Sequence, residues 1–369
     1  MTTVSADHVV LPDRVLSPGA VRVEGDRILA VEPGDSPRVG HWLLPGLVDI
    51  HVHGGGGASF DGGYAEARRA AEYHLAHGTT SAVASLVTAA PGDLLAQTAT
   101  LAELCEDGTL AGIHLEGPFL SAARCGAHDA ALLRAPDPDL LEALLAAGRG
   151  HVRQVTIAPE LPGAVELIHR LAAHGVTAAL GHTDASYPET VEGLTAGARL
   201  ATHLFNAMRP LHHRDPGPVA AVLGTPGVVA EVIGDGVHLA DATVGMLFAT
   251  LGPDRLALVT DAMAAAGAED GAYTLGGRDV RVRDGVARIG DVIAGGTATL
   301  ARVLGRAVEH GVPVRDAVRA ATLTPARAVG LADRGALEPG RRADLLVLDA
   351  GLRPTAVMRG GVWVARPPR

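Results

Sequence analysis

The stretch "LVDIHVHGGGGASF" at residues 47–60 points to the fold of the whole chain. A run of apolar, strand-forming residues ends in two histidines, His51 and His53, and four glycines follow. Side chains two positions apart in an extended strand lie on the same side, so the two imidazoles share one face. The glycines remove side-chain bulk, which lets other backbone and a substrate approach closely. The stretch therefore predicts a buried strand that delivers two imidazoles to one point.

Short apolar runs of this kind recur along the chain and alternate with helical patterns. Two clear helical patterns, at 62–78 and 162–175, each end in glycine. Eight such units in succession favour an α/β fold, a parallel (β/α)8 TIM-like barrel whose active residues lie at the C-terminal ends of the strands. The eight strands are expected at 47–53, 81–87, 110–116, 152–159, 176–182, 199–205, 227–235 and 255–262.

Both ends of the chain show short alternating strands instead. We expect residues 1–44 and 335–369 to form one small β-sandwich domain, and residues 45–334 to form the catalytic barrel. Within the barrel domain, residues 271–290 read as a β-hairpin after the eighth strand, followed by helices at 297–328.

The charge of the chain excludes several classes of function. Its 369 residues carry a formal net charge of −10 without a basic run, which argues against a nucleic-acid partner. All 31 basic residues are arginine, so a Schiff-base lysine, a Walker lysine or a carbamylated metal-bridging lysine is impossible. An anionic substrate would need a local group of arginine or protonated histidine side chains.

Cysteine content and hydropathy predict the compartment. Only Cys105 and Cys125 are present, too few for a disulfide framework. The first residues lack the pattern of a signal peptide, and no apolar run approaches the roughly 18 residues of a membrane span. We therefore expect a cytoplasmic protein without a membrane partner.

Polar side chains occur at or just after the ends of six of the expected strands. Taken singly, each has a structural reading, because a lone histidine or carboxylate is more often a satisfied buried group or a surface residue. Together, imidazoles and carboxylates that converge at the catalytic end of a barrel form a ligand set for one or two divalent metals. Without a cation, nothing would offset the cost of desolvating them. The residues are His51, His53, Glu116, His182, His203, His238 and Asp261.

Longer motifs around these residues resemble the amidohydrolase superfamily along nearly the whole chain. The segments "LPGLVDIHVHG" (44–54) and "PGRRADLLVLD" (339–349) are general to that superfamily. The pair "HLEGPFL" (114–120) and "THLFNAM" (202–208) resembles its branch of amino-sugar phosphate deacetylases. The absence of lysine agrees with this branch, because relatives similar to dihydroorotase and urease usually bridge two metals with a carbamylated lysine.

The resemblance implies a role for each of the strand-end residues. Glu116, His182 and His203 match the metal ligands used throughout the family. The histidine pair of the first strand matches that of binuclear members, so two ions of zinc, iron(II) or manganese are expected, with Glu116 as the bridge. Asp261 matches a further ligand that is also the general acid/base. It would take a proton from a metal-activated water, and the resulting hydroxide would attack the acetamide. It would then protonate the leaving amine.

Further matches imply how the substrate is held. His128, otherwise readable as a surface-loop histidine, matches a residue that polarises the carbonyl oxygen and contacts the sugar. Asn206 and the backbone of Ala207 are expected to contact the phosphate, and His238 the sugar or the phosphate. Arg214, otherwise readable as a solvated loop charge, matches a phosphate-binding arginine that reaches into the neighbouring subunit. Its planar fork suits a phosphate dianion, and a homodimer with shared sites is therefore expected.

The resemblance implies hydrolysis of N-acetylglucosamine 6-phosphate to glucosamine 6-phosphate and acetate, in amino-sugar catabolism or cell-wall recycling. The N-acetylgalactosamine 6-phosphate isomer, which differs at one hydroxyl, is an alternative substrate. A D-aminoacylase-type hydrolase is another alternative, although it would not need the phosphate-binding residues. An inactive homologue that acts as a scaffold or sugar sensor is disfavoured, because no expected metal ligand is missing.

Two segments depart from the family pattern. The stretch "RCGAH" (124–128) has no lysine where the family often has one, and it places Cys125 near His128 as either an inert or a regulatory thiol. The stretch "AGGTATL" (294–300) replaces the usual AGS-type segment, which leaves a substrate contact there open.

Overall fold

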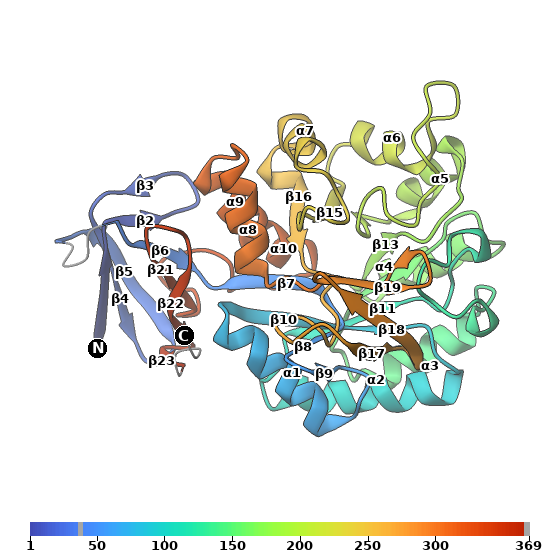
Figure 1. Cartoon of the computed structure of the whole chain (residues 1–369), viewed down its shortest axis with the longest axis horizontal. Helices are drawn as coiled ribbons and strands as arrows, with labels where there is room; N and C mark the ends of the chain where they lie inside the picture. Colours follow the sequence, from blue (N-terminus) through green and yellow to red (C-terminus); the bar gives the residue numbers. More distant parts are fainter. Residues whose placement is uncertain (36–39, 365–369) are drawn as a thin grey trace.

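An eight-stranded parallel sheet forms the centre of the molecule (Figure 1). The computed structural model describes residues 1–35 and 40–364. Neighbouring strands of this sheet pair in parallel, in the order β16-β15-β14-β13-β12-β11-β10-β7. They are β7 (Leu47–Val52), β10 (Thr79–Val87), β11 (Gly112–Glu116), β12 (Val152–Ile157), β13 (Thr177–Leu180), β14 (Leu200–Ala201), β15 (Val229–Ile233) and β16 (Leu256–Val259). The prediction of a (β/α)8 barrel is confirmed.

Helices cover the outer face of the sheet because one side of each is apolar. Helix α4 buries Leu167, Ile168 and Leu171 against the strands and leaves Glu166 exposed, the spacing of an amphipathic helix. The helices are α1 (Tyr64–Ala76), α2 (Pro91–Glu106), α3 (Pro138–Ala147), α4 (Ala164–Ala173), α5 (Tyr187–Ala196), α6 (Gly217–Gly224), α7 (Asp241–Leu251), α8 (Leu300–Glu309), α9 (Val314–Ala320) and α10 (Leu323–Ala328). In the described part of the chain, no helix combines the length and the apolar character needed to cross a bilayer.

The barrel closes between β7 and β16, at the end where ligands are expected. The backbone N–H of Asp261 donates to the carbonyl oxygen of His51 at 2.8 Å. The backbone N–H of His53 donates to the carbonyl oxygen of Ala262 at 2.7 Å. These two bonds bring the end of the first strand directly against the end of the eighth, so the closure of the barrel also brings candidate ligands together.

The glycines after His53 serve close packing of the backbone. Gly54 and Gly55 form β8 (Gly54–Gly55), which pairs with β9 (Ala58–Ser59). A Cβ atom on Gly54 would lie 2.4 Å from the carbonyl oxygen of Ala58, and one on Gly55 would lie 2.6 Å from the His74 ring. Close packing, rather than access for a substrate, therefore explains why side chains are absent here.

Both chain ends contribute strands to a second, β-rich part of the molecule, at the left of Figure 1. One sheet has the order β1-β4-β5 and the other β23-β22-β21-β6-β2-β3. Their facing side chains, among them Val21, Ile28, Leu43 and Leu345, share one apolar cluster, as in a β-sandwich. The strands are β1 (Thr2–Ala6), β2 (His8–Val10), β3 (Val15–Leu16), β4 (Gly19–Glu24), β5 (Arg27–Pro33), β6 (Trp42–Pro45), β21 (Leu345–Leu348), β22 (Pro354–Arg359) and β23 (Val362–Trp363).

The predicted boundaries of this domain, 1–44 and 335–369, remain a prediction. Strand β6 begins on one side of the first boundary and ends on the other. The segments 36–39 and 365–369 lie outside the described residues.

The insertion after β16 is larger than the expected hairpin. It forms a four-stranded antiparallel sheet of β17 (Ala272–Leu275), β18 (Arg278–Arg283), β19 (Val286–Ile289) and β20 (Val292–Ile293). Each connection contains glycine with a positive φ, which tight hairpin turns require. We call this sheet the flap. Its buried residues pack with Val87, Met263 and Ala264 of the barrel, so the flap is anchored to the barrel.

Candidate metal centre and substrate pocket

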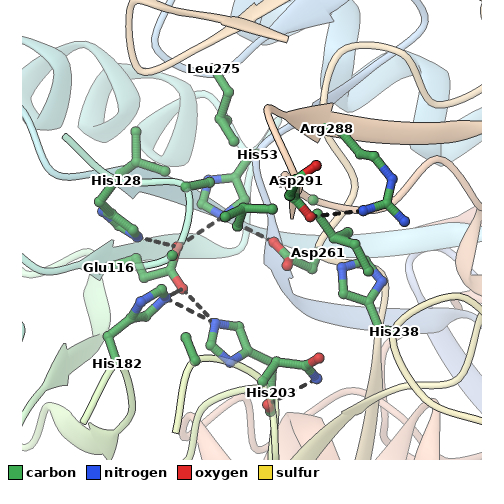
Figure 2. Close-up of a pocket in the computed structure, with 18 residues that line it drawn as sticks. His53, Glu116, His128, His182, His203, His238, Asp261, Leu275, Arg288 and Asp291 are labelled. Carbon is green, nitrogen blue, oxygen red and sulfur yellow. Dashed lines mark hydrogen bonds and ion pairs between the residues drawn. The ribbon is translucent and has the colours of Figure 1, made fainter. Parts of the chain in front are cut away.

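Two groups of three potential metal ligands meet at the C-terminal end of the barrel. Figure 2 shows all of them except His51. All of these side chains are buried. They are the residues expected from the sequence. The first group, site A, comprises Glu116, His182 and His203, and the second, site B, comprises His51, His53 and Asp261.

The geometry of site A fits a metal ion. Oε1 of Glu116 lies 3.1 Å from Nε2 of His182 and 3.0 Å from Nε2 of His203. The two Nε2 atoms are 3.1 Å apart. Ligand atoms about 2.0 Å from a tetrahedral zinc ion lie roughly 3.3 Å from one another. The three atoms therefore form a triangle of about the size that a bound ion would impose.

Site B has similar dimensions and is adjacent to site A. Nε2 of His53 lies 3.1 Å from Nε2 of His51 and 3.2 Å from Oδ1 of Asp261. Nε2 of His51 is 3.5 Å from the same Asp261 oxygen. The second oxygen of Glu116, Oε2, lies 3.2 Å from Nε2 of His53. Glu116 thus directs one oxygen to each site, the arrangement required of a bridging carboxylate.

Hydrogen bonds behind two of the imidazoles determine which nitrogen faces each site. Nδ1 of His182 lies 2.9 Å from the carbonyl oxygen of Arg124. Because a carbonyl only accepts, Nδ1 carries the hydrogen, and Nε2 presents its lone pair when the ring is neutral. Nδ1 of His51 lies 2.9 Å from Oε2 of Glu231 in the same manner. Histidine ligands of metals usually donate their second N–H to such an acceptor, so the tautomers fit a metal.

Glu231 is a residue that the sequence reasoning missed. It is fully buried in β15 and accepts from the His51 ring, from Nε2 of Gln154 at 2.6 Å and from the backbone N–H of His203 at 3.2 Å. It therefore contacts one member of each site. A single carboxylate in the otherwise apolar segment 227–233 was the available signal, because a buried charge needs partners.

Unusual backbone conformations occur at three of the ligands. His182, His203 and Asp261 have φ values of 47°, 27° and 48°, in the left-handed region, and so has Ala207 at 48°. Each such residue costs about 1–3 kcal/mol, and such residues cluster at functional sites. Each of these three candidate ligands stands two residues beyond the end of its strand. The strands end at Leu180, Ala201 and Val259, before His182, His203 and Asp261 respectively. The left-handed backbone conformation just after each strand therefore helps to place the candidate ligand.

Without a metal, the buried carboxylates keep a proton on site B. Burial alone would lower the pKa of His53, but bonds to Asp261 and Glu116 raise it to about 9. Burial alone would raise the pKa of Asp261, but the His51 charge and the bond to His53 hold it below its usual range. A divalent ion can neutralise the same carboxylates, so metal binding replaces protons.

His128 differs from His53 because it is held neutral. Burial lowers the pKa of His128 to about 4. Its Nδ1 accepts the backbone N–H of Thr88 at 3.2 Å, so the hydrogen lies on Nε2, 3.4 Å from Oε2 of Glu116. His128 therefore presents an N–H donor beside the candidate metal ligands.

A cavity of about 350 Å³ opens over both sites. His128, Asn206, Ala207 and His238 line it, as expected from the sequence. Nδ1 of His238 lies 2.8 Å from Oδ2 of Asp235. Arg214 is not among the lining residues of its own chain: it is exposed, and its Nη1 lies 2.6 Å from Nε2 of His213.

The flap forms one wall of the cavity, which the sequence reasoning also missed. Arg278 in β18 donates from Nη1 to the carbonyl oxygens of Ala127 and His128, at 3.0 Å each, and so holds the loop that carries His128. Nothing in the composition of residues 271–293 signals this role, because it depends on how the insertion folds back over the barrel. The flap residues that line the cavity are Leu275, Arg288, Asp291, Val292 and Ile293.

Comparison with known sequences places the chain and its relatives in the same family. The model of the amidohydrolase family matches residues 42–364. An N-acetylglucosamine-6-phosphate deacetylase of Vibrio furnissii is 36% identical over 316 residues, 84% of this chain and 79% of that protein. An N-acetylgalactosamine-6-phosphate deacetylase of Escherichia coli O157:H7 is 35% identical over 343 residues, 90% of this chain and 91% of that protein.

Solved structures agree in fold over nearly the full length. N-acetyl-D-glucosamine-6-phosphate deacetylase from Mycobacterium smegmatis, solved as a mutant in complex with N-acetyl-D-glucosamine-6-phosphate, superposes with a TM-score of 0.95 at 48% identity. The match covers 98% of both chains. The N-acetylglucosamine-6-phosphate deacetylase of Thermotoga maritima superposes with a TM-score of 0.92 at 30% identity, over 99% of this chain and 100% of that one.

Proposed function

The chain belongs to the amidohydrolase family, and from that premise we propose that it is an N-acetylglucosamine-6-phosphate deacetylase. It hydrolyses the acetamide of N-acetyl-D-glucosamine 6-phosphate to D-glucosamine 6-phosphate and acetate. One observation carries the proposal: two ligand groups that share Glu116 adjoin the neutral donor His128 and the carboxylate Asp261 in one cavity.

The ligands of sites A and B fit one or two divalent ions. Imidazole and carboxylate donors make zinc, iron(II) and manganese the candidates. Bound there, such an ion supplies a Lewis acid and lowers the pKa of a water molecule. His51, His53, His182 and His203 would hold it, with Glu116 between the two positions.

Asp261 moves the proton in the proposed reaction. Its carboxylate is held ionised, which is the form that accepts a proton, and it lines the cavity. It takes the proton of the water that attacks the acetamide carbonyl. It then gives that proton to the amide nitrogen as the carbon–nitrogen bond breaks, because an amine leaves poorly unless it is protonated.

His128 stabilises the charge that develops on the carbonyl oxygen. A neutral imidazole with its hydrogen on Nε2 can donate a hydrogen bond to the carbonyl oxygen without first having to gain a proton. A fixed donor of this kind is worth more in a buried site than in water, because it does not need to reorganise during the reaction. The clamp from Arg278 to the backbone of His128 supports this fixed position.

We propose that the phosphate of the substrate binds at the part of the cavity formed by Asn206, Ala207 and His238. Asn206, Ala207 and His238 line the cavity and are assigned to the sugar phosphate. Arg214 extends into solvent from the loop between β14 and α6, which suits a residue that completes the cavity of a partner subunit. We therefore include a homodimer with shared sites in the proposal.

A reducing compartment agrees with the two cysteines. Cys105 and Cys125 are both free thiols. Free thiols and the lack of a disulfide between them are typical of cytoplasmic proteins, so we propose that location.

The N-acetylgalactosamine 6-phosphate isomer is the second candidate substrate. The Escherichia coli relative named for that isomer is nearly as similar as the Vibrio relative named for the gluco form, at 35% against 36% identity. The two sugars differ at one hydroxyl, and the phosphate and acetamide contacts described above apply to both.

Release of acetate from metal-replete protein tests the proposal. Both hexosamine phosphates and both unphosphorylated parents are assayed in parallel. We expect turnover of N-acetylglucosamine 6-phosphate with a higher kcat/KM than for the other three compounds. Equal activity on phosphorylated and unphosphorylated sugars, or preference for an N-acyl-D-amino acid, would contradict the assignment.

A further inference from the structure

Among the residues that the structure describes, one arginine lines the cavity, and it has no carboxylate partner. Among the described residues that line the cavity, Arg288 is the single arginine, and Glu116, Asp261 and Asp291 are the carboxylates. Within the described part of the chain, no carboxylate oxygen lies within ion-pair distance of Arg288. A chain of net charge −10 offers carboxylates freely, so an unpaired guanidinium at this point needs an explanation.

One hydrogen bond holds Arg288 at the cavity, and most of its N–H donors have no partner among the described residues. It lies in β19, where alternation buries Ala287 in the apolar contact of the flap with the barrel and leaves Arg288 exposed on the other face. Its Nη1 donates to the backbone carbonyl of Asp291 at 2.9 Å. Nε and Nη2 remain free for a ligand, since a guanidinium has five N–H donors. Figure 2 shows the side chain on the same side of the cavity as His238.

A second arginine lies directly opposite Arg288 in the flap. Arg281 of β18 is its cross-strand partner, so both side chains project from one face. Like charges directly opposite one another destabilise a sheet. An anion bound near Arg288 would relieve this repulsion, and two cations side by side bind a dianion better than one.

We propose that Arg288 binds the phosphate group of the substrate from within the same chain and thereby selects phosphorylated over unphosphorylated amino sugars. This inference rests on the proposed function, and it adds a cation that does not depend on a partner subunit. The flap thus carries a specificity residue, in addition to holding the His128 loop through Arg278.

The test compares Arg288→Gln with a matched control, Arg283→Gln. Arg283 lies in β18, is also exposed and does not line the cavity, so both changes remove one charge from the same sheet. We expect Arg288→Gln to raise KM for N-acetylglucosamine 6-phosphate about tenfold, the effect of losing a charge-assisted hydrogen bond at an open site. KM for the unphosphorylated sugar should rise much less. Arg288→Lys should retain most of the affinity, and the difference between wild type and Arg288→Gln should shrink in high salt.

Binding of glucose 6-phosphate to the metal-replete protein, followed by calorimetry, separates recognition of the phosphate from turnover. A weakening of about tenfold in Arg288→Gln but not in Arg283→Gln supports the proposal. Equal affinities in the two variants, or an equal rise in KM for both sugars, overturn it, because a purely structural role would affect both sugars alike. If wild type binds glucose 6-phosphate through Arg288 but releases no acetate from either hexosamine phosphate, the proposed reaction fails and the phosphate site stands.

Discussion

Glu231→Gln should weaken metal binding at site B while preserving shape. The wild-type carboxylate accepts from the His51 ring at 2.9 Å, from Gln154 at 2.6 Å and from the His203 backbone at 3.2 Å. A glutamine has a single acceptor oxygen, and its NH2 group would face one of these three donors. At least one buried donor is then left without an acceptor.

The size of the effect follows from two independent magnitudes. A buried donor that loses its partner costs about 1–3 kcal/mol. Loss of the residue that orients a histidine ligand typically costs about 10- to 100-fold in metal affinity. At about 1.4 kcal/mol per factor of ten, that range corresponds to roughly 1.4–2.8 kcal/mol. The two values agree, so we expect the affinity of site B to fall by about one to two orders of magnitude, and that of site A to fall less, because Glu231 contacts His203 only at the backbone.

Metal-buffered titration with elemental analysis measures the effect, and Asp49→Asn is the matched control. Asp49 is also a fully buried carboxylate, but it bonds Thr260 Oγ1 at 2.6 Å and reaches His51 only at the backbone N–H, at 3.3 Å. Burial raises the pKa of Asp49 to about 7, so its neutral amide analogue is a mild change. Glu231→Gln protein that holds both ions with wild-type affinity, or Asp49→Asn protein that loses metal equally, would refute the reasoning.

Three further predictions concern the proton, the metal and the dimer. Asp261→Asn removes the proton acceptor, and steady-state kinetics should show kcat lowered by roughly two to four orders of magnitude with little change in substrate affinity; near-normal turnover would assign the proton to another group. Because the pKa of His53 in the metal-free protein is raised to about 9 from 6.5, a proton competes with the metal below pH 9. Chelator competition should therefore show affinity at site B rising about tenfold per pH unit from pH 7 to pH 9, and a plateau already at pH 7 would show that His53 is not protonated. Arg214→Ala should raise KM for the phosphorylated sugar and leave the metal content unchanged. Arg214→Ala and Asp261→Asn chains that are refolded together should regain activity in mixed dimers. If such heterodimers form but show no activity, Arg214 acts in the site of its own chain.

The barrel and the grouping of its candidate ligands were predictable because each is a local property of the sequence. A strand, a helix and the glycine between them are recognisable within about fifteen residues, and the fold then brings all strand ends to one face. His51, Glu116, His182, His203 and Asp261 could therefore be grouped without knowledge of any distance. The resemblance to a known family added His128 and Asn206, which line the cavity and are proposed to contact the substrate, but which have no local signature of their own.

Residues that act through long-range contacts were not predictable in this way. Glu231 lies in the middle of a strand. Its role depends on the side chains of His51 and Gln154 and on the backbone N–H of His203, all of them far away in the sequence. Arg288 depends on the folding of the flap, where three glycine-containing turns produce four strands instead of the two expected. In both cases the sequence shows an ordinary charged residue, and only the packing reveals what it contacts.

The segment "AGGTATL" supports the strained backbone of Asp261. With a φ of 48°, Asp261 is stable only if its surroundings fix it. Its N–H donates to the carbonyl of His51 at 2.8 Å, and its carbonyl accepts the N–H of Gly296 at 2.7 Å. A Cβ atom on Gly296 would lie 2.4 Å from the carbonyl oxygen of Thr260, so the two backbone segments pack closely where this second bond is made. One bond that closes the barrel, from Asp261 to His51, and the bond from Gly296 therefore together fix the backbone of Asp261, the residue proposed to transfer the proton.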